Sequence, residues 1–158
     1  VVNKFTSSGM KSKKLPKLRQ KIGMVFQNYL LMNDRDLFEN IALPLHVLGF
    51  PKRQITESVE KSLDEFGLSN KVNHYPHELS GGEQQRACVA RAMIKDPDIL
   101  LSDEPTVNLD TVTSFDLIKI IEKINKSGTK ILMDSHNYNL IKGRGHRIIE
   151  IQNGSVRS

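Results

Sequence analysis

Short apolar runs along this chain alternate with longer stretches in which apolar residues recur at helical spacing. Residues 22–26 (IGMVF), 99–101 (ILL) and 129–133 (TKILM) are typical of strands buried on both faces. Residues 110–128 have helical periodicity and end at a glycine, which favours a helix stop. A strand, a helix and a strand in succession predict a parallel βαβ unit. The predicted fold class is therefore α/β, with a mainly parallel sheet flanked by helices.

A mostly helical stretch separates the first two predicted strands. Helical spacing predicts one helix within Asp36–Gly49, interrupted by Pro44, and another over Pro51–Gly67, whereas residues 70–78 have the composition of a loop. This connection is too long for a simple crossover, so we predict an inserted helical lobe that is not an independent domain. The predicted parts are core over 1–27, helical lobe over 28–95 and core over 96–158.

The two ends of the chain have weaker patterns. Val1–Phe5 predicts a short strand, and apolar residues within 15–22 predict one or two helical turns. Near the other end, Asn153-Gly154 supplies the positive φ angles that a tight turn needs, which predicts a hairpin over 146–156. Val1 is not a start methionine and opens the sequence as though in mid-strand, so we expect further chain to precede it.

The composition is that of an ordinary soluble domain, since 38% of the 158 residues are apolar and 26% are charged. The net charge of +5 comes from 23 basic and 18 acidic residues. A solvated face explains the main basic cluster better than nucleic-acid binding does, because no aromatic residues interleave to stack bases. That cluster comprises Lys11, Lys13, Lys14, Lys17, Arg19 and Lys21. No nucleic-acid partner is expected.

Cys88 is the single cysteine, which excludes an internal disulfide, fits a reducing cytosolic compartment and predicts a position in the core. No apolar run approaches the roughly 20 residues that span a bilayer. Membrane association is therefore expected only through a partner.

A phosphate-binding turn is predicted at the start of the stretch LSGGEQQRACVARAMIKDPDILLSDEPTVNLD, residues 79–110. Ser80, Gly81 and Gly82 open its helical run. Small residues allow close approach there, and free N–H groups at the positive end of the helix dipole suit an anion.

Four polar residues follow the carboxyl ends of the predicted strands, where α/β folds keep their ligands: Gln27, Asp103, Glu104 and His136. Magnesium bound to phosphates needs few protein ligands, and Asp103 can supply a carboxylate while Gln27 supplies an amide oxygen. Glu104 can orient or deprotonate an attacking water, and His136 can contact a γ-phosphate. Phosphoryl transfer requires little more than such positioning and charge neutralisation.

Each of these signals is weak by itself. Glycine-rich turns are common, an Asp-Glu pair before proline is more often a turn or helix entry, and a lone histidine after a strand is usually a surface residue. The combination of LSGGEQQR, an apolar run into DEP and then NLD favours the functional interpretation.

Residues 79–110 resemble the signature motif, Walker B strand and D-loop of the ATP-binding-cassette (ABC) ATPases, which have a P-loop NTPase fold, and VFQ ending at Gln27 resembles their Q-loop. The resemblance implies ATP and Mg²⁺ as cofactors and a homodimer joined through the signature motif and D-loop. It implies ATP contacts for Gln27, Ser80, Gly81, Gly82, Gln84 and Asp110, metal binding for Asp103 and Gln27, and catalytic roles for Glu104 as base and His136 as switch histidine. The signature residues would serve the ATP of the opposite subunit.

Two segments resemble the branch of this family that works in cell division with an integral membrane subunit of the permease kind: RQKIGMVFQNYLLMNDRDLFENIALPLHVLG and ILMDSHNYNLIKGRGHRIIEIQNG. ATPases of lipoprotein release and macrolide export share EN(I/V)ALPL and DEPTxNLD, so they stay the alternative. The implied location is peripheral, on the cytoplasmic face of the cell membrane.

Some positions depart from the family pattern. The Walker A sequence GxxxxGK(S/T), expected some tens of residues before Gln27, is absent from these residues, as is the upstream aromatic residue that stacks on adenine. Val107 stands where glycine is usual and is strained if the backbone there needs φ > 0. Ser135 replaces a usual threonine, and Gly143-Arg144-Gly145 is expected to loosen a segment that should end a helix.

Two functions of different classes follow. In the first, the chain is the larger, carboxyl-terminal part of an ATP hydrolase, inactive by itself without Walker A. In the second, it is a non-hydrolysing interaction module that offers only its signature face. In either case we expect exposed apolar surface and low stability for the chain alone, because the absent first strands would cover the centre of the sheet.

Overall fold

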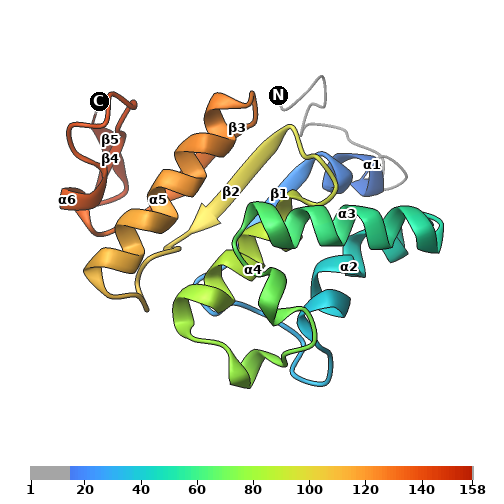
Figure 1. Cartoon of the computed structure of the whole chain (residues 1–158). Coiled ribbons are helices and arrows are strands. Elements are labelled where there is room, and N and C mark those ends of the chain that lie inside the picture. The colour runs from blue at the N-terminus through green and yellow to red at the C-terminus, as the bar shows by residue number, and fades with distance from the viewer. Residues whose placement is uncertain (1–14, 158) are drawn as a thin grey trace.

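A parallel sheet organises the part of the chain that the computed structural model describes, residues 15–157 (Figure 1). Its strands are β1 (Ile22–Val25), β2 (Ile99–Asp103) and β3 (Lys130–Asp134), in the order β1-β2-β3. Both strand pairs are parallel, so the predicted α/β class and the βαβ unit are confirmed. The strand predicted over Val1–Phe5 and the basic residues Lys11, Lys13 and Lys14 lie outside the described residues.

Two long helices, α4 (Gly81–Met93) and α5 (Thr111–Lys126), lie on the same side of this sheet (Figure 1). Helix α4 approaches β1 closely, since a Cβ atom on Gly23 would lie 2.9 Å from the carbonyl oxygen of Ala92. Helix α5 connects β2 to β3 and ends before Gly128, whose φ of 112° suits a glycine. The short α1 (Leu15–Gln20) precedes β1, as its apolar spacing predicts.

The helical lobe contains α2 (Leu37–Val47) and α3 (Lys52–Glu65), followed by two short 3₁₀ turns, η2 (Ser69–Lys71) and η3 (Pro76–Glu78). Those turns give residues 70–78 more structure than the predicted loop. The lobe shares one apolar core with the sheet. That shared core agrees with the prediction that the lobe is not an independent domain, while the division at 28 and 95 stays a prediction.

The predicted interruption at Pro44 is wrong, because α2 runs through this residue as one helix. A proline inside a helix removes one backbone hydrogen bond, but tertiary packing can offset that loss. Leu37, Ile41 and Leu45 are buried along one side of α2. The buried Asn40 side chain accepts a bond of 2.7 Å from Met32 N and donates to the carbonyls of Met32, Arg35 and Asp36, which fixes the first turn.

The end of the chain forms the short α6 (Tyr138–Ile141) and a hairpin of β4 (Glu150–Gln152) and β5 (Ser155–Arg157). Asn153 and Gly154 have φ angles of 50° and 75°, which confirms the predicted turn, although β4 begins four residues later than residue 146. Between α6 and β4, Arg144 donates to Leu140 O and forms a 2.8 Å ion pair with Glu122 of α5. The segment that we expected to be loosened at Gly143-Arg144-Gly145 is thus tied to α5.

One face of the sheet carries an exposed apolar row. Met24, Leu101 and Leu132 lie side by side in the register of the three strands. Met24 is 49% exposed and Leu132 is 65% exposed. The exposed apolar surface expected for this chain is therefore present.

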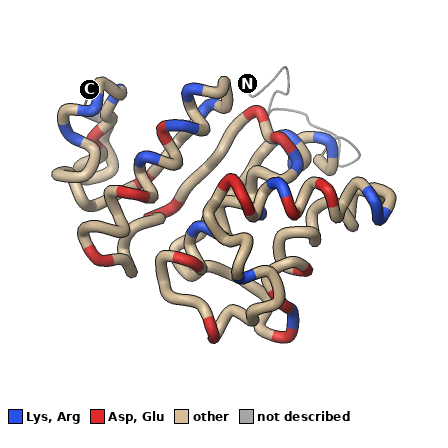
Figure 2. The backbone as a smooth tube through the Cα atoms, in the orientation of Figure 1, with Lys and Arg blue, Asp and Glu red and all other residues tan. Residues whose placement is uncertain are grey.

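Basic and acidic residues, blue and red in Figure 2, are both spread along the tube of residues 15–157. Among these same residues, no helix has the length and apolar character that crossing a membrane requires.

Candidate functional site

The signature turn is built by a capping box at the start of α4. Ser80 is the N-cap, and its Oγ accepts a 3.3 Å bond from Glu83 N, while the Glu83 carboxylate accepts bonds of 2.8 Å from Ser80 N and 2.9 Å from Ser80 Oγ. The N–H groups of Gly81 and Gly82 lie in the first turn, where the helix itself offers no acceptor. The structure thus places the three residues at a helix N-terminus, as the sequence predicts, with Ser80 exposed and both glycines half-buried.

Glu83 is a member of this site that the sequence analysis did not single out, although the S-x-x-E spacing is a recognisable capping signal. Hydrogen bonding to Ser80 lowers the pKa of the Glu83 carboxyl, with a further lowering from the charge of Lys71. The Lys71 ammonium lies 3.4 Å from the carboxylate. An anion bound at Gly81 and Gly82 would meet this carboxylate, so Lys71 helps to balance the charge of the turn.

Both signature glycines are packed against neighbouring loops of the same chain. A Cβ atom on Gly81 would lie 3.0 Å from Tyr29 Oη and 3.6 Å from Asn108 O. A Cβ atom on Gly82 would lie only 2.5 Å from Thr113 Cγ2. Intrachain packing therefore requires residues without a side chain at both positions.

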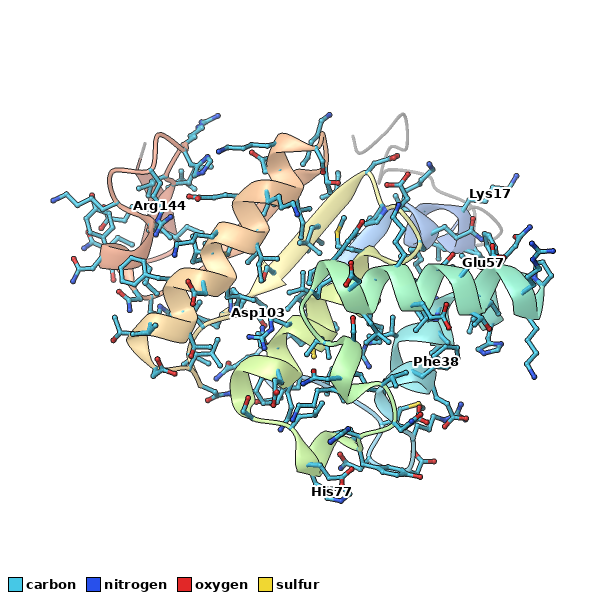
Figure 3. The ribbon with its side chains drawn as sticks, viewed as in Figure 1. Lys17, Phe38, Glu57, His77, Asp103 and Arg144 are labelled. Atoms are coloured by element: carbon cyan, nitrogen blue, oxygen red, sulfur yellow. The ribbon has the colours of Figure 1, made fainter. Side chains whose placement is uncertain are left out.

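The carboxylate pair lies where β2 ends, and the label Asp103 in Figure 3 marks this point. Asp103 is the last residue of β2 and is exposed, whereas Glu104 is only 7% exposed. Glu104 has a φ of 44°, in the left-handed region that non-glycine residues rarely adopt, and its N–H donates a 3.2 Å bond to Asp134 O. This turn points the two adjacent side chains into different surroundings, as different roles require.

His136 meets Glu104 directly. The His136 N–H donates a 2.8 Å bond to Glu104 Oε1, and His136 Nε2 lies 3.3 Å from the same oxygen. The His136 side chain is 90% exposed and the Glu104 side chain 9% exposed. The imidazole ring therefore faces solvent, while the carboxylate that it meets is nearly buried. Both residues line a cavity of about 510 Å³ together with Thr106, Val107, Leu109, Thr111, Ser114, Asn137, Tyr138 and Asn139.

Gln27 lies at the same edge of the sheet. Val25, Ser102 and Met133 are register partners, so Gln27, Asp103 and His136 follow three neighbouring strand ends. Adjacent strands lie about 4.8 Å apart, which places the Gln27 strand roughly 10 Å from that of His136. Gln27 is exposed, and its backbone carbonyl oxygen accepts a 3.3 Å bond from Asn108 Nδ2.

Within residues 15–157, no group of three or more His, Cys, Asp and Glu side chains is arranged to hold a metal ion. One exposed carboxylate and one exposed amide at a strand edge suit Mg²⁺, which commonly keeps several waters and takes further ligands from phosphates. Asp103 and Gln27 are therefore the residues that fit this ion.

Asp110 and Val107 differ from expectation. Asp110 is the N-cap of α5, and bonds from the Thr113 hydroxyl and from Thr113 N, the latter at 3.0 Å, lower the pKa of its carboxyl. This carboxylate stabilises its own helix whether or not it also acts across a dimer. Val107 is not among the described residues with positive φ, so the strain considered for it is absent there. The left-handed residue of this loop is Glu104 instead.

No hydrogen bond or ion pair among the described side chains joins Ser80, Gly81 or Gly82 to Asp103, Glu104 or His136. The structure thus separates the predicted residues into an edge group of Gln27, Asp103, Glu104 and His136 and a signature group at the start of α4. Tyr29, Asn108 and Leu109 lie beside Gly81, and Thr113 of α5 lies beside Gly82, so loops from the strand edge and the start of α5 pack against the signature turn.

Comparison with known proteins agrees with this geometry. The ABC transporter family model matches residues 3–107. The dimeric post-hydrolysis state of the ATP-binding cassette MJ0796 bound to ADP and Pi has a TM-score of 0.76 at 30% identity, over 88% of this chain and 62% of that one. The chain therefore belongs to the ABC transporter family, with the fold of its ATP-binding cassettes.

Curated relatives include the cell division ATP-binding protein FtsE from two bacteria. The protein of Streptococcus pneumoniae (serotype 2, strain D39 / NCTC 7466) is 45% identical over 152 residues, which are 96% of this chain and 66% of the relative. That of Mycobacterium tuberculosis (strain ATCC 25618 / H37Rv) is 42% identical over 155 residues, 98% of this chain and 67% of the relative. The chain spans about two thirds of the length of these relatives. The predicted likeness to the cell-division branch is confirmed.

Proposed function

We propose that this chain forms the signature and Walker B part of an ATP hydrolase that works as a homodimer and drives a membrane partner in cell division, as an FtsE-like protein with an FtsX-like permease. One observation carries the hydrolase proposal: the nearly buried Glu104 carboxylate is held by the His136 N–H at 2.8 Å, beside the exposed His136 ring. A carboxylate fixed in this way keeps its second oxygen for a water molecule.

Glu104 acts as general base in this proposal. Its carboxylate accepts a proton from the attacking water as the water oxygen bonds to the γ-phosphorus and the bond to the β–γ bridging oxygen breaks. His136 donates to a γ-phosphate oxygen, and Asp103 and Gln27 hold Mg²⁺, which neutralises phosphate charge when bound. Positioning and charge neutralisation are the main requirements of such a reaction.

Ser80, Gly81 and Gly82, with Gln84, serve the ATP of a second subunit in this proposal, and Asp110 lies at the same dimer contact. The separation of the signature group from the edge group of its own chain supports this arrangement. The dimeric form of the similar cassette, bound to ADP and Pi, supports it as well.

The membrane partner and the location are inferred from the cell-division relatives. We place the protein at the cytoplasmic face of the cell membrane, bound through its permease, with the helical lobe over 28–95 as the coupling part. ATPases of lipoprotein release and macrolide export stay the alternative within the family.

Replacing Glu104 with Gln tests the hydrolase proposal in a protein that carries a Walker A segment ahead of this chain. The amide keeps the shape but cannot accept the proton, so we expect ATP turnover to fall by about 10²–10⁴-fold while nucleotide binding is retained. Steady-state phosphate release and equilibrium binding of a fluorescent ATP analogue measure the two effects. The exposed Glu60→Gln of α3 is a matched control that should keep full turnover. Undiminished hydrolysis by Glu104→Gln would count against the assigned base.

A second candidate of another class is a non-hydrolysing module that presents only its signature face. Two measurements separate the candidates. An in-frame Walker A sequence in the DNA upstream of codon 1 supports the hydrolase. Phosphate release by the purified chain, alone and mixed with an intact homologue, shows whether the signature face supports catalysis only in a mixed dimer. Substantial turnover by the chain alone would contradict the need for a Walker A segment.

A further inference from the structure

Two consecutive residues just after Gln27 have an unusual backbone. Tyr29 and Leu30 have φ angles of 54° and 53°, in the left-handed region that favours glycine. Large side chains keep such a conformation only where surrounding contacts impose it. Contacts from elsewhere in the chain must therefore hold this turn.

Helix α4 supplies those contacts from a single face. Arg91 Nη2 donates a 2.9 Å bond to Tyr29 O, and Arg91 Nη1 donates a 2.6 Å bond to Leu30 O. Cys88 Sγ, one turn earlier on α4, lies 2.9 Å from Tyr29 O. The planar fork of arginine suits two neighbouring carbonyls, and a lysine has no equivalent geometry. Burial lowers the pKa of Arg91, because the guanidinium is drawn into the protein to reach these atoms.

The Tyr29 side chain reaches the opposite end of the same helix. Its hydroxyl lies 3.0 Å from the position of a Cβ atom on Gly81, at the signature turn. Gly81 in turn packs against Asn108 and Leu109, and the Asn108 side chain donates to Gln27 O. The left-handed turn thus contacts α4 at two places: the carbonyls of Tyr29 and Leu30 meet Arg91, and the Tyr29 hydroxyl lies beside Gly81.

We propose that Arg91 and Tyr29 are positioning residues that lock the Gln27 loop to the signature helix, so that the metal-binding edge and the signature turn keep a fixed spacing. Arg91 holds the left-handed turn, and Tyr29 sets the distance to Gly81. Both residues act through contacts with protein atoms of the chain. The catalytic part of this inference rests on the proposed function, whereas the loop geometry does not.

Hydrogen exchange of the chain measures the lock without ATP. In Arg91→Ala we expect peptides covering 27–32 to exchange about tenfold faster or more, while peptides within 83–90 of α4 keep their protection. The exposed Arg53→Ala of α3 is the matched control, because this side chain is 90% exposed and bonds Glu57 of its own helix. Unchanged exchange over 27–32 in Arg91→Ala would overturn the proposal.

A rescue experiment separates positioning from general loss of packing. Glycine adopts left-handed φ readily, so adding Leu30→Gly, at a side chain that is 56% exposed, should restore slow exchange over 27–32 in the Arg91→Ala background. If Arg91→Ala does not fold, Arg91→Lys takes its place, with an expected increase of about threefold that Leu30→Gly reverses. Exchange in Arg91→Lys equal to the parent, or no reversal by Leu30→Gly, would contradict the role of the fork.

The consequence for catalysis is tested in a protein that carries the Walker A segment. Arg91→Ala should lower kcat by about tenfold or more and leave the KM for ATP within about twofold. The spacing between the metal-binding edge and the signature turn affects how the two subunits of the dimer close on ATP, and not how ATP first binds. Retained kcat together with fast exchange over 27–32 would show that the lock exists but does not serve hydrolysis. Loss of activity in Arg91→Ala without any effect of Glu104→Gln would instead count against the proposed function.

Discussion

At the residue scale, burial and hydrogen bonding decide what each polar or reactive side chain does. Glu104 and Asp103 are neighbours in sequence, yet one is nearly buried and bonded to His136 while the other is exposed. Cys88 is fully buried beside Tyr29, as predicted for a core cysteine. Burial raises the pKa of its thiol to about 12.

Cys88 should therefore be inert toward thiol reagents in the folded chain. The thiolate is the reactive form, and with a pKa of about 12 the thiolate fraction at pH 8 is about 10⁻⁴. We expect labelling by a chromogenic disulfide reagent to be slower than in the denatured chain by a factor of about 100 or more. The same reagent in denaturant provides the control rate. Rapid labelling under native conditions would show that α4 opens readily or that Cys88 is not buried.

At the element scale, the signature turn depends on the start of α5 as much as on its own helix. The Thr113 hydroxyl donates to the Asp110 carboxylate, so this side chain cannot rotate away without losing that hydrogen bond. Its methyl group occupies the space beside Gly82. The bond between Thr113 and Asp110 at the start of α5 thereby limits the size of the residue at position 82, at the start of α4.

Gly82→Ala should destabilise the chain by about 1–3 kcal/mol, because the new methyl group would meet Thr113 Cγ2. Chemical denaturation followed by far-ultraviolet circular dichroism measures this change. Thr113→Ser keeps the hydroxyl that donates to Asp110 and removes the clashing methyl, so the double variant Gly82→Ala with Thr113→Ser should recover most of the loss. If Thr113→Ser does not reduce the loss of stability caused by Gly82→Ala, Gly82 is required for another reason.

At the scale of the whole molecule, the open row of Met24, Leu101 and Leu132 sets the behaviour of the chain in solution. An exposed apolar sheet face favours association, and charged side chains on strands oppose it. Within residues 15–157, β3 pairs with β2 and no further strand joins its other edge. We therefore expect self-association of the described structure to involve this row and the open edge of β3.

Replacing Met24 and Leu132 with lysine should reduce self-association and the binding of a hydrophobic dye. Stability should change by less than about 0.5 kcal/mol for each substitution, because both side chains are largely exposed. Light scattering and dye fluorescence measure the effect. Val47→Lys is the control, since Val47 is 79% exposed on α2 and outside the row. A parent chain that is monomeric and binds no dye would contradict this prediction.

The sequence alone determined the strands, the long helices, the hairpin turn and the candidate residues. Periodicity, capping residues and turn residues act over a few neighbouring positions, so IGMVF, DILLSD and the Asn153-Gly154 turn could be recognised without a structure. Local pattern failed at Pro44, because packing of Leu37, Ile41 and Leu45 carries α2 through the proline.

Only the tertiary structure decided which residues meet. His136 and Glu104 are 32 residues apart in sequence, and Arg91 and Tyr29 are 62 apart, so neither hydrogen bond follows from local spacing. The left-handed backbone of Glu104 and of Tyr29-Leu30 is likewise imposed by contacts from distant segments. Local chemistry therefore specified the groups, whereas packing between elements fixed their distances, their burial and the partners they hold.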